Sequence, residues 1–171
     1  MTDSGRLVRT RARGNFRNRK ITPLVGDRVV IDAPNDHEGY ILEVKPRRNS
    51  LVRPPVANVD QAIVATAVRQ PAFSTNLLDR QLLALEIADI EPVIYLTKTD
   101  LLTAAEQTEF AGIAAAYRKI GYQVVYTAEP FSAAALKEVD DLLAGKVSVI
   151  MGQTGAGKST LLHHVAPDLK M

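Results

Sequence analysis

The sequence predicts an all-β domain, a small barrel or sandwich, followed by an α/β domain with a mainly parallel sheet. Three observations indicate this fold class. The first half contains short strand-like runs separated by turns, the second half alternates apolar runs with helical patterns, and residues 152–160 read GQTGAGKST between such a run and a helix. With 171 residues, 46% of them hydrophobic, the chain can bury one ordinary core or two small ones.

The first half of the chain is predicted to form short strands joined by turns. Three segments indicate this: GRLVRTRARG, which alternates from Leu7, the β-branched DRVVID, and EGYILEVK, which follows the turn-forming APNDHEG. We therefore assign residues 1–50 to a basic all-β domain. Residues 51–58 include Pro54 and Pro55 and show neither a strand nor a helix period, so we interpret them as a linker.

Apolar runs alternate with helical patterns over residues 59–171. The runs are QAIVATAV, PVIYLT, YQVVYT and KVSVIM. The first helix between them places Leu78, Leu82 and Leu85 on one face. Continuous apolar strands separated by helices of this length predict a parallel sheet with right-handed crossovers.

The predicted helices carry start and stop signals. Ser74 or Thr75 can cap the first helix, and Thr103 with Glu106 forms a capping-box pattern at the second, for which Gly121 is a suitable stop. SAAALKEVDDLLAG predicts a third helix and STLLHHV a fourth.

The stretch GQTGAGKST matches the G-x-x-x-x-G-K-[ST] pattern of a phosphate-binding loop. Its glycines let the backbone curl so that successive N–H groups point at phosphate oxygens, and the helix N-terminus adds its dipole. Lys158 brings a positive charge to the β and γ phosphates, and Ser159 offers a hydroxyl to Mg²⁺. The pattern predicts a nucleoside triphosphate site made of Gly152, Gln153, Thr154, Gly155, Ala156, Gly157, Lys158, Ser159 and Thr160.

The segment YLTKTDL is a candidate base site. Asp100 follows the run PVIYLT, at the carboxyl edge of the predicted sheet, where ligands of open α/β folds bind. A carboxylate there can accept the N1 and N2 hydrogens of guanine, which adenine does not offer, and the stem of Lys98 can cover the base. Alone, the motif fits a capping Asp beside a solvated Lys better than a base site. Together with a phosphate loop, Thr97, Lys98, Thr99 and Asp100 predict guanine.

The order of these motifs resembles that of a circularly permuted GTPase. TKTD is similar to the base-recognition motif of GTPases, usually Asn-Lys-x-Asp, and YTAE, with Thr127 and Ala128, is similar to the later Ser-Ala motif. RARGNFR, ITPLVGDRV, LVRPPVANVDQ and LLDRQLLALEIADIEPVIYLTKTDL resemble the small ribosomal subunit biogenesis GTPases called RsgA. Thr97 departs from the usual Asn, since it keeps a hydroxyl and loses an amide that can brace the loop.

The resemblance implies an N-terminal OB-fold barrel, here without its first strand, and a permuted GTPase domain that stops after the phosphate-loop helix. It implies GTP or GDP with Mg²⁺ as ligands, zinc only in a further C-terminal domain, and GTP hydrolysis stimulated by the small ribosomal subunit. In the family, the switch segments that orient the attacking water follow the phosphate loop. We therefore expect a fragment of a longer protein and assign no catalytic residue within it.

The N-terminal part of the chain is strongly basic. Residues 1–60 carry 12 Lys and Arg against 7 Asp and Glu, although the whole chain has a net charge of only +2. A basic barrel face with an aromatic side chain can follow a phosphate backbone, and the resemblance makes 16S rRNA in the 30S subunit the expected partner. A solvated face is the alternative. The candidate RNA-binding residues are Arg9, Arg11, Arg13, Phe16, Arg17, Arg19 and Lys20.

Composition excludes several classes of site. The sequence has no Cys, which rules out disulfides and thiolate metal sites and fits a reducing cytoplasm. No apolar run reaches the roughly 20 residues that span a bilayer, so we expect no membrane association and a cytoplasmic protein. We also expect a monomer. His163 and His164 point about 100° apart on a helix, so they cannot share one metal ion.

Two other functions remain open from the sequence. A phosphate-loop ATPase or kinase would not use Asp100 to choose the base, so Asp100→Asn would leave its nucleotide affinity unchanged. In a non-catalytic RNA-binding module with a vestigial site, Lys158→Ala would change neither nucleotide binding nor RNA binding.

Overall fold

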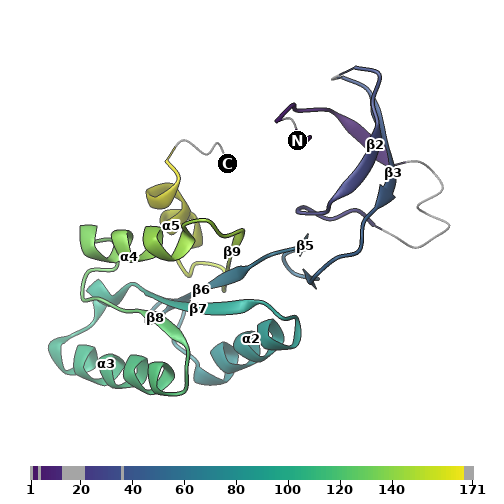
Figure 1. Cartoon of the computed structure of the whole chain (residues 1–171). Helices are drawn as coiled ribbons and strands as arrows, with labels where there is room; N and C mark the ends of the chain where they lie inside the picture. The colour runs from purple at the N-terminus through teal and green to yellow at the C-terminus, as the bar shows by residue number, and fades with distance from the viewer. Residues whose placement is uncertain (1, 4, 13–21, 36, 168–171) are drawn as a thin grey trace. The chain divides into compact units, whose positions relative to one another are not determined.

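The chain divides into two compact units, residues 1–58 and 59–171 (Figure 1). The computed structural model describes residues 2–3, 5–12, 22–35 and 37–167. In these ranges, none of the helices combines the length and the apolar character that a membrane crossing needs.

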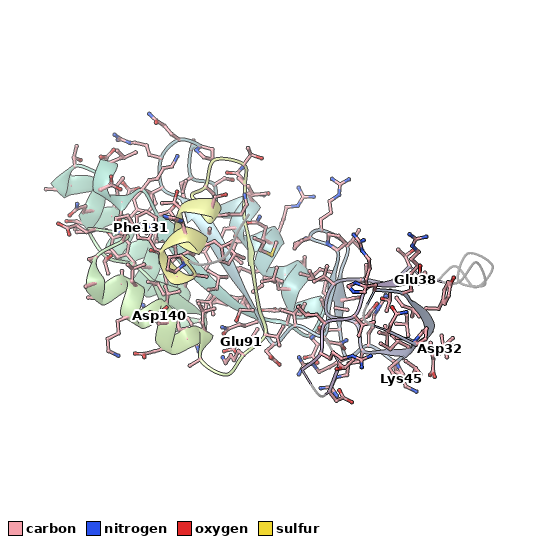
Figure 2. All side chains as sticks on the ribbon, turned by 90° about the horizontal axis from the view of Figure 1, so that it is seen from above. Asp32, Glu38, Lys45, Glu91, Phe131 and Asp140 are labelled. Carbon is pink, nitrogen blue, oxygen red and sulfur yellow. The ribbon has the colours of Figure 1, made fainter. Side chains whose placement is uncertain are left out.

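The N-terminal unit contains a three-stranded sheet in the order β1-β3-β2. β1 (Thr10–Ala12) pairs parallel with β3 (Gly39–Val44), which pairs antiparallel with β2 (Val29–Asp32). The alternation predicted from Leu7 becomes a regular strand only at Thr10, because that residue pairs with the first residue of β3. Leu7 itself is exposed. Figure 2 labels Asp32, Glu38 and Lys45 on this unit.

Two side chains stabilise the turns of the N-terminal unit. The Asn35 carboxamide oxygen accepts the N–H groups of His37 and Glu38, each at 2.9 Å, in the turn between β2 and β3. The Arg47 guanidinium donates to both carboxylate oxygens of Asp27, at 2.7 and 2.8 Å. These hydrogen bonds lower the pKa of Asp27.

The segment interpreted as a linker forms regular structure. β4 (Ser50–Leu51) pairs antiparallel with β5 (Val56–Ala57), and the two prolines lie between these strands. The packing against the preceding turn is tight, because a Cβ on Gly26 would lie 2.1 Å from the Ala57 carbonyl oxygen. Residues 51–58 therefore belong to the first compact unit, which differs from the irregular connection that their lack of a period suggested. The sequence pattern could not show this, because a two-residue strand is too short to display a period.

The C-terminal unit is built on a four-stranded sheet in the order β8-β7-β6-β9, and every neighbouring pair is parallel. The strands are β6 (Gln61–Ala67), β7 (Glu91–Thr97), β8 (Gln123–Val125) and β9 (Ser148–Met151). The predicted parallel sheet is confirmed. Although β9 comes last in the sequence, it pairs with β6, the first strand of the unit.

Helices cover both faces of this sheet. They are α2 (Thr75–Ile87), α3 (Ala104–Lys119), α4 (Ala133–Leu143) and α5 (Lys158–Val165), with the short 3-10 helix η1 (Thr99–Leu101) after β7. Figure 1 shows α2 and α3 on one face and α4 and α5 on the other. Under α4 and α5, Ile63, Tyr95 and Val125 of the sheet pack with Val139 and Leu161 in one buried cluster.

The helix signals predicted from the sequence are confirmed. The Ser74 side chain accepts the Leu77 N–H at the start of α2, and Thr103 and Glu106 form a complete capping box on α3. Gly121 follows α3 with φ +106°, a left-handed conformation that suits glycine. The predicted stripe on α2 is buried and consists of Leu78, Leu82 and Leu85.

Candidate functional site

The phosphate-loop segment connects β9 to α5, and its first glycine is required by a close backbone contact. Gly152 has φ +140°, and a Cβ at this position would lie 2.1 Å from the Ala65 carbonyl oxygen on β6. Any other residue would therefore push β6 and the loop apart. At the other end, Gly157 has φ +87° and stands at the N-cap of α5. The loop turns directly into the helix, so the N-terminal N–H groups of α5 lie at the site.

Charged and hydroxyl groups gather at the start of α5. The Lys158 ammonium donates to the carbonyl oxygens of Gly152 and Gln153, at 3.0 and 2.6 Å, and so folds back over the loop. Ser159 and Thr160 are exposed in the first turn of the helix. Together these groups form a positively charged surface rich in hydrogen-bond donors, which suits an anion. The hydroxyl groups can also bind a cation that accompanies the anion.

The base-loop candidates occupy the end of β7 and η1. Thr97 is fully buried, and its hydroxyl donates to the Ala156 carbonyl at 2.7 Å. Lys98 adopts a left-handed conformation with φ +60°, which turns the chain into η1, and Asp100 is exposed on η1. The Thr99 hydroxyl donates to the Ala128 carbonyl at 3.3 Å. The candidate base loop is thus hydrogen-bonded both to the phosphate-loop segment and to the loop after β8.

The loop after β8 is hydrogen-bonded to Tyr95 of the neighbouring strand β7. The Tyr95 hydroxyl donates to the Pro130 carbonyl, and burial raises its pKa to about 12, so it stays protonated and able to donate. The Thr127 hydroxyl donates to the Glu129 carbonyl at 2.6 Å. Phe131 stacks on His164 of α5, with ring centroids 4.6 Å apart and planes 10° apart. Figure 2 labels Phe131 beside α5.

These loops enclose a pocket of about 430 Å³ at the carboxyl edge of the sheet. Five of the residues predicted from the sequence line it, namely Thr97, Lys98, Asp100, Gly157 and Thr160. The other candidates are not among its lining residues; they are Thr99, Thr127, Ala128, Gly152, Gln153, Thr154, Gly155, Ala156, Lys158 and Ser159. The pocket can hold a planar polar ring next to Asp100 and an anion toward α5.

Four lining residues were missed in the sequence, namely Glu129, Pro130, Phe131 and Ser132. They follow directly on Thr127 and Ala128, and this position after a motif is the signal that could have found them. These residues form one wall of the pocket because Pro130 is bound by Tyr95 and Phe131 stacks on His164. Both partners are distant in the sequence, so no local pattern shows these contacts.

The two basic candidates that fall within the described ranges lie on the N-terminal unit. Arg9 and Arg11 are exposed and border a depression of about 210 Å³ together with His37 and Tyr40. The other RNA-binding candidates lie outside the described residues; they are Arg13, Phe16, Arg17, Arg19 and Lys20.

Metal-ligand clusters are absent from the described part of the chain, where no three His, Cys, Asp or Glu side chains converge. The His163 and His164 rings are 6.3 Å apart, with their planes nearly perpendicular. The His164 Nδ1 atom lies 2.7 Å from the Thr160 carbonyl oxygen. His164 therefore packs against Phe131 and lies within hydrogen-bond distance of the preceding helical turn.

The comparisons with known proteins all indicate the same family. A sequence model described as RsgA GTPase matches residues 44–171, and one described as RsgA N-terminal domain matches residues 1–41. The chain is 58% identical to the small ribosomal subunit biogenesis GTPase RsgA of Limosilactobacillus reuteri, with 97% of this chain and 56% of the relative covered. It is 59% identical to RsgA 1 of Lactiplantibacillus plantarum, with 98% and 56% covered.

Two solved structures share the fold. YjeQ from Thermotoga maritima matches with a TM-score of 0.84 and 32% identity, over 99% of this chain and 60% of that one. YloQ, described as a circularly permuted GTPase, matches with a TM-score of 0.76 and 44% identity, over 98% and 58%. The chain spans about 56% of the length of the curated relatives it matches. The chain belongs to the RsgA GTPase family, and it combines an OB-type N-terminal domain with part of a circularly permuted GTPase domain.

Proposed function

We propose that the pocket binds GTP or GDP and that the whole protein hydrolyses GTP in the biogenesis of the small ribosomal subunit. The observation that carries the proposal is the buried hydrogen bond between the Thr97 hydroxyl and the Ala156 carbonyl, which holds the base-loop and phosphate-loop segments at one pocket. The names of the relatives support the same activity.

The base is bound at Asp100. Its carboxylate accepts the N1 and N2 hydrogens of guanine, and the aliphatic stem of Lys98 covers the ring. Adenine offers no matching pair of donors, so it displaces water from the carboxylate without replacing those hydrogen bonds, which lowers its affinity relative to guanine. Thr127 and Ala128 shape the loop that closes the base side of the pocket.

The phosphates are bound by the backbone of residues 152–157 and the N-terminus of α5. Lys158 exchanges its two carbonyl partners for phosphate oxygens, which gives a stronger, charge-assisted contact. The exposed Ser159 hydroxyl fits a ligand of Mg²⁺, which neutralises charge on the β and γ phosphates.

The permuted order of motifs is compatible with this site because the sheet brings the ends of its strands together. β9 pairs with β6, and β6 with β7, so the loops after β9 and β7 lie two strands apart at one edge. The residues that a ligand contacts at that edge depend on the arrangement of the strands in space and not on their order in the chain.

We further propose that the whole protein acts as a cytoplasmic monomer, contacts 16S rRNA in the 30S subunit through the basic N-terminal unit, and carries zinc only in a further C-terminal domain. The exposed Arg9 and Arg11 support the RNA contact, since such side chains neutralise phosphates without reading sequence.

Titration with fluorescent GDP and ADP in Mg²⁺, followed by competition with GTP and ATP, tests the nucleotide site. We expect a clear guanine preference that Asp100→Asn removes and a loss of affinity for both nucleotides in Lys158→Ala. Equal affinity for GDP and ADP would favour an ATPase or kinase. Absence of nucleotide binding, with the chain folded, would favour an RNA-binding module.

A further inference from the structure

The segment directly after β6 contacts the base loop at two points. The Arg69 Nη1 group donates to the Leu101 carbonyl at 3.3 Å, and its Nη2 group forms an ion pair with Glu106. The next residue, Gln70, accepts a hydrogen bond from the Lys98 ammonium through its carbonyl oxygen. Neither Arg69 nor Gln70 belongs to a recognised nucleotide motif.

These two contacts lie on either side of Asp100. Lys98 precedes it and Leu101 follows it, and both are bound to the segment at residues 69–70. Within the described part of the chain, the Asp100 carboxylate has no hydrogen-bond partner of its own and is exposed. With no side-chain partner in the described residues, the carboxylate is presented by the backbone of η1. The segment after β6 contacts that backbone at the Leu101 carbonyl, and it binds the side chain of Lys98 just before η1.

The Arg69 guanidinium suits this position for a geometric reason. Its planar fork reaches a carbonyl at the end of η1 and the Glu106 carboxylate at the start of α3 simultaneously. Glu106 is itself fixed by the capping box with Thr103, in which its carboxylate accepts the Thr103 N–H at 2.8 Å. Arg69 thus ties η1 to a rigid helix start.

The same segment also adjoins the phosphate loop. Pro71 is the neighbour that a Cβ on Gly155 would meet, with the Pro71 Cδ atom at 3.8 Å. Phe73 packs edge-on against Phe110 of α3, with ring centroids 5.1 Å apart. The segment is therefore anchored to α3 on one side and lies beside the phosphate loop on the other.

We propose that Arg69 is a positioning residue that sets the direction of Asp100 and thereby the preference of the site for guanine over hypoxanthine. This inference rests on the proposed nucleotide function. Guanine offers both N1–H and N2–H to the carboxylate, whereas hypoxanthine offers only N1–H. Accepting both hydrogens requires the carboxylate to lie in the plane of the base, whereas a single hydrogen bond tolerates a wider range of orientations. A loose η1 therefore weakens the binding of guanine more than that of hypoxanthine.

The test is the ratio of GDP to IDP affinity in Mg²⁺, measured on the 171-residue chain by titration. Arg69→Ala lowers this ratio about three- to tenfold, because the affinity for GDP falls while that for IDP changes little. Arg69→Lys, which retains the charge but makes a single contact, gives an intermediate ratio. The matched control is Arg80→Ala, an exposed arginine on α2, which keeps the original ratio.

The outcomes separate this inference from the proposed function. One outcome would overturn only this inference. The original chain prefers GDP to ADP and loses that preference in Asp100→Asn, yet Arg69→Ala and Arg69→Lys keep the original ratio of GDP to IDP affinity. In that case Arg69 does not position the carboxylate. If the original chain shows no preference for GDP over ADP, the nucleotide function itself is wrong and this inference falls with it. An equal loss of GDP and IDP affinity in both Arg69 variants would indicate general loosening of the pocket and would also overturn the inference.

Discussion

The Thr97 hydroxyl donates a 2.7 Å hydrogen bond to the carbonyl of Ala156, 59 residues away in the sequence. Both residues are buried, so the bond joins the end of β7 to the phosphate-loop segment without solvent competition. The Thr97 hydroxyl therefore braces the phosphate-loop segment against the end of β7.

Removing that hydroxyl is expected to loosen the pocket. Thr97→Val preserves the shape of the side chain but leaves the buried Ala156 carbonyl without this donor. We expect the free energy of unfolding to fall by about 1–3 kcal/mol, together with weaker GDP binding. Urea unfolding and GDP titration measure the two effects. Thr97→Ser, which keeps the hydroxyl, is the control, and equal behaviour of the Val and Ser variants would show that the bond has no role.

The close contact at Gly152 predicts a large difference between two glycine substitutions. Gly152→Ala places a methyl group 2.1 Å from the Ala65 carbonyl in a backbone conformation with φ +140°, so we expect a loss of about 2 kcal/mol or more and impaired GDP binding. Gly112→Ala, on the open face of α3, has no atom within 4 Å and should stabilise the helix by about 0.5–1 kcal/mol. Thermal unfolding of both variants checks the prediction, and similar midpoints would contradict it.

The capping box predicts a pH-dependent contribution to stability. Hydrogen bonds from Thr103, with a smaller effect of Arg69, lower the pKa of Glu106 below its ordinary value of 4.5. A carboxylate whose pKa is lower in the folded state stabilises the fold above the ordinary pKa, and the stabilisation is lost as the pH falls through the folded pKa. We expect Glu106→Gln to be less stable than the original chain at pH 7 and equally stable near pH 2. A stability difference that stays constant over this range would exclude the effect.

The exposed arginines of the N-terminal unit predict salt-dependent RNA binding. Replacing Arg9 and Arg11 by Ala should weaken binding to a labelled 16S rRNA fragment and reduce the salt slope by about 1 for each phosphate that is no longer neutralised. Filter binding or fluorescence anisotropy at several salt concentrations measures the slope. Arg80→Ala lies in the other unit and should leave it unchanged. An unchanged slope in the double variant would indicate that these arginines form only a solvated face.

Features that depend on neighbouring residues were predictable from the sequence. The capping box of Thr103 and Glu106 and the buried Leu stripe on α2 follow from patterns within one or two helical turns. The parallel direction of the strands follows from the alternation of apolar runs with helices along the chain, although their order does not. The short β4–β5 pair was not predictable, because its strands are stabilised by contacts with Val25 and Gly26 and have no period of their own. The Phe131 wall was missed for the same reason, since its support comes from His164.

By itself, the sequence determined the chemical groups available for nucleotide binding and the secondary structure on which most of them lie. The glycines, Lys158 and Asp100 were recognisable because their spacing reflects local backbone geometry. Only the tertiary structure decided which of these groups share a pocket and what holds them there. The hydrogen bond from Thr97 to Ala156 and the reach of Arg69 to Leu101 depend on the pairing of strands far apart in the chain, and no local pattern records which strands become neighbours.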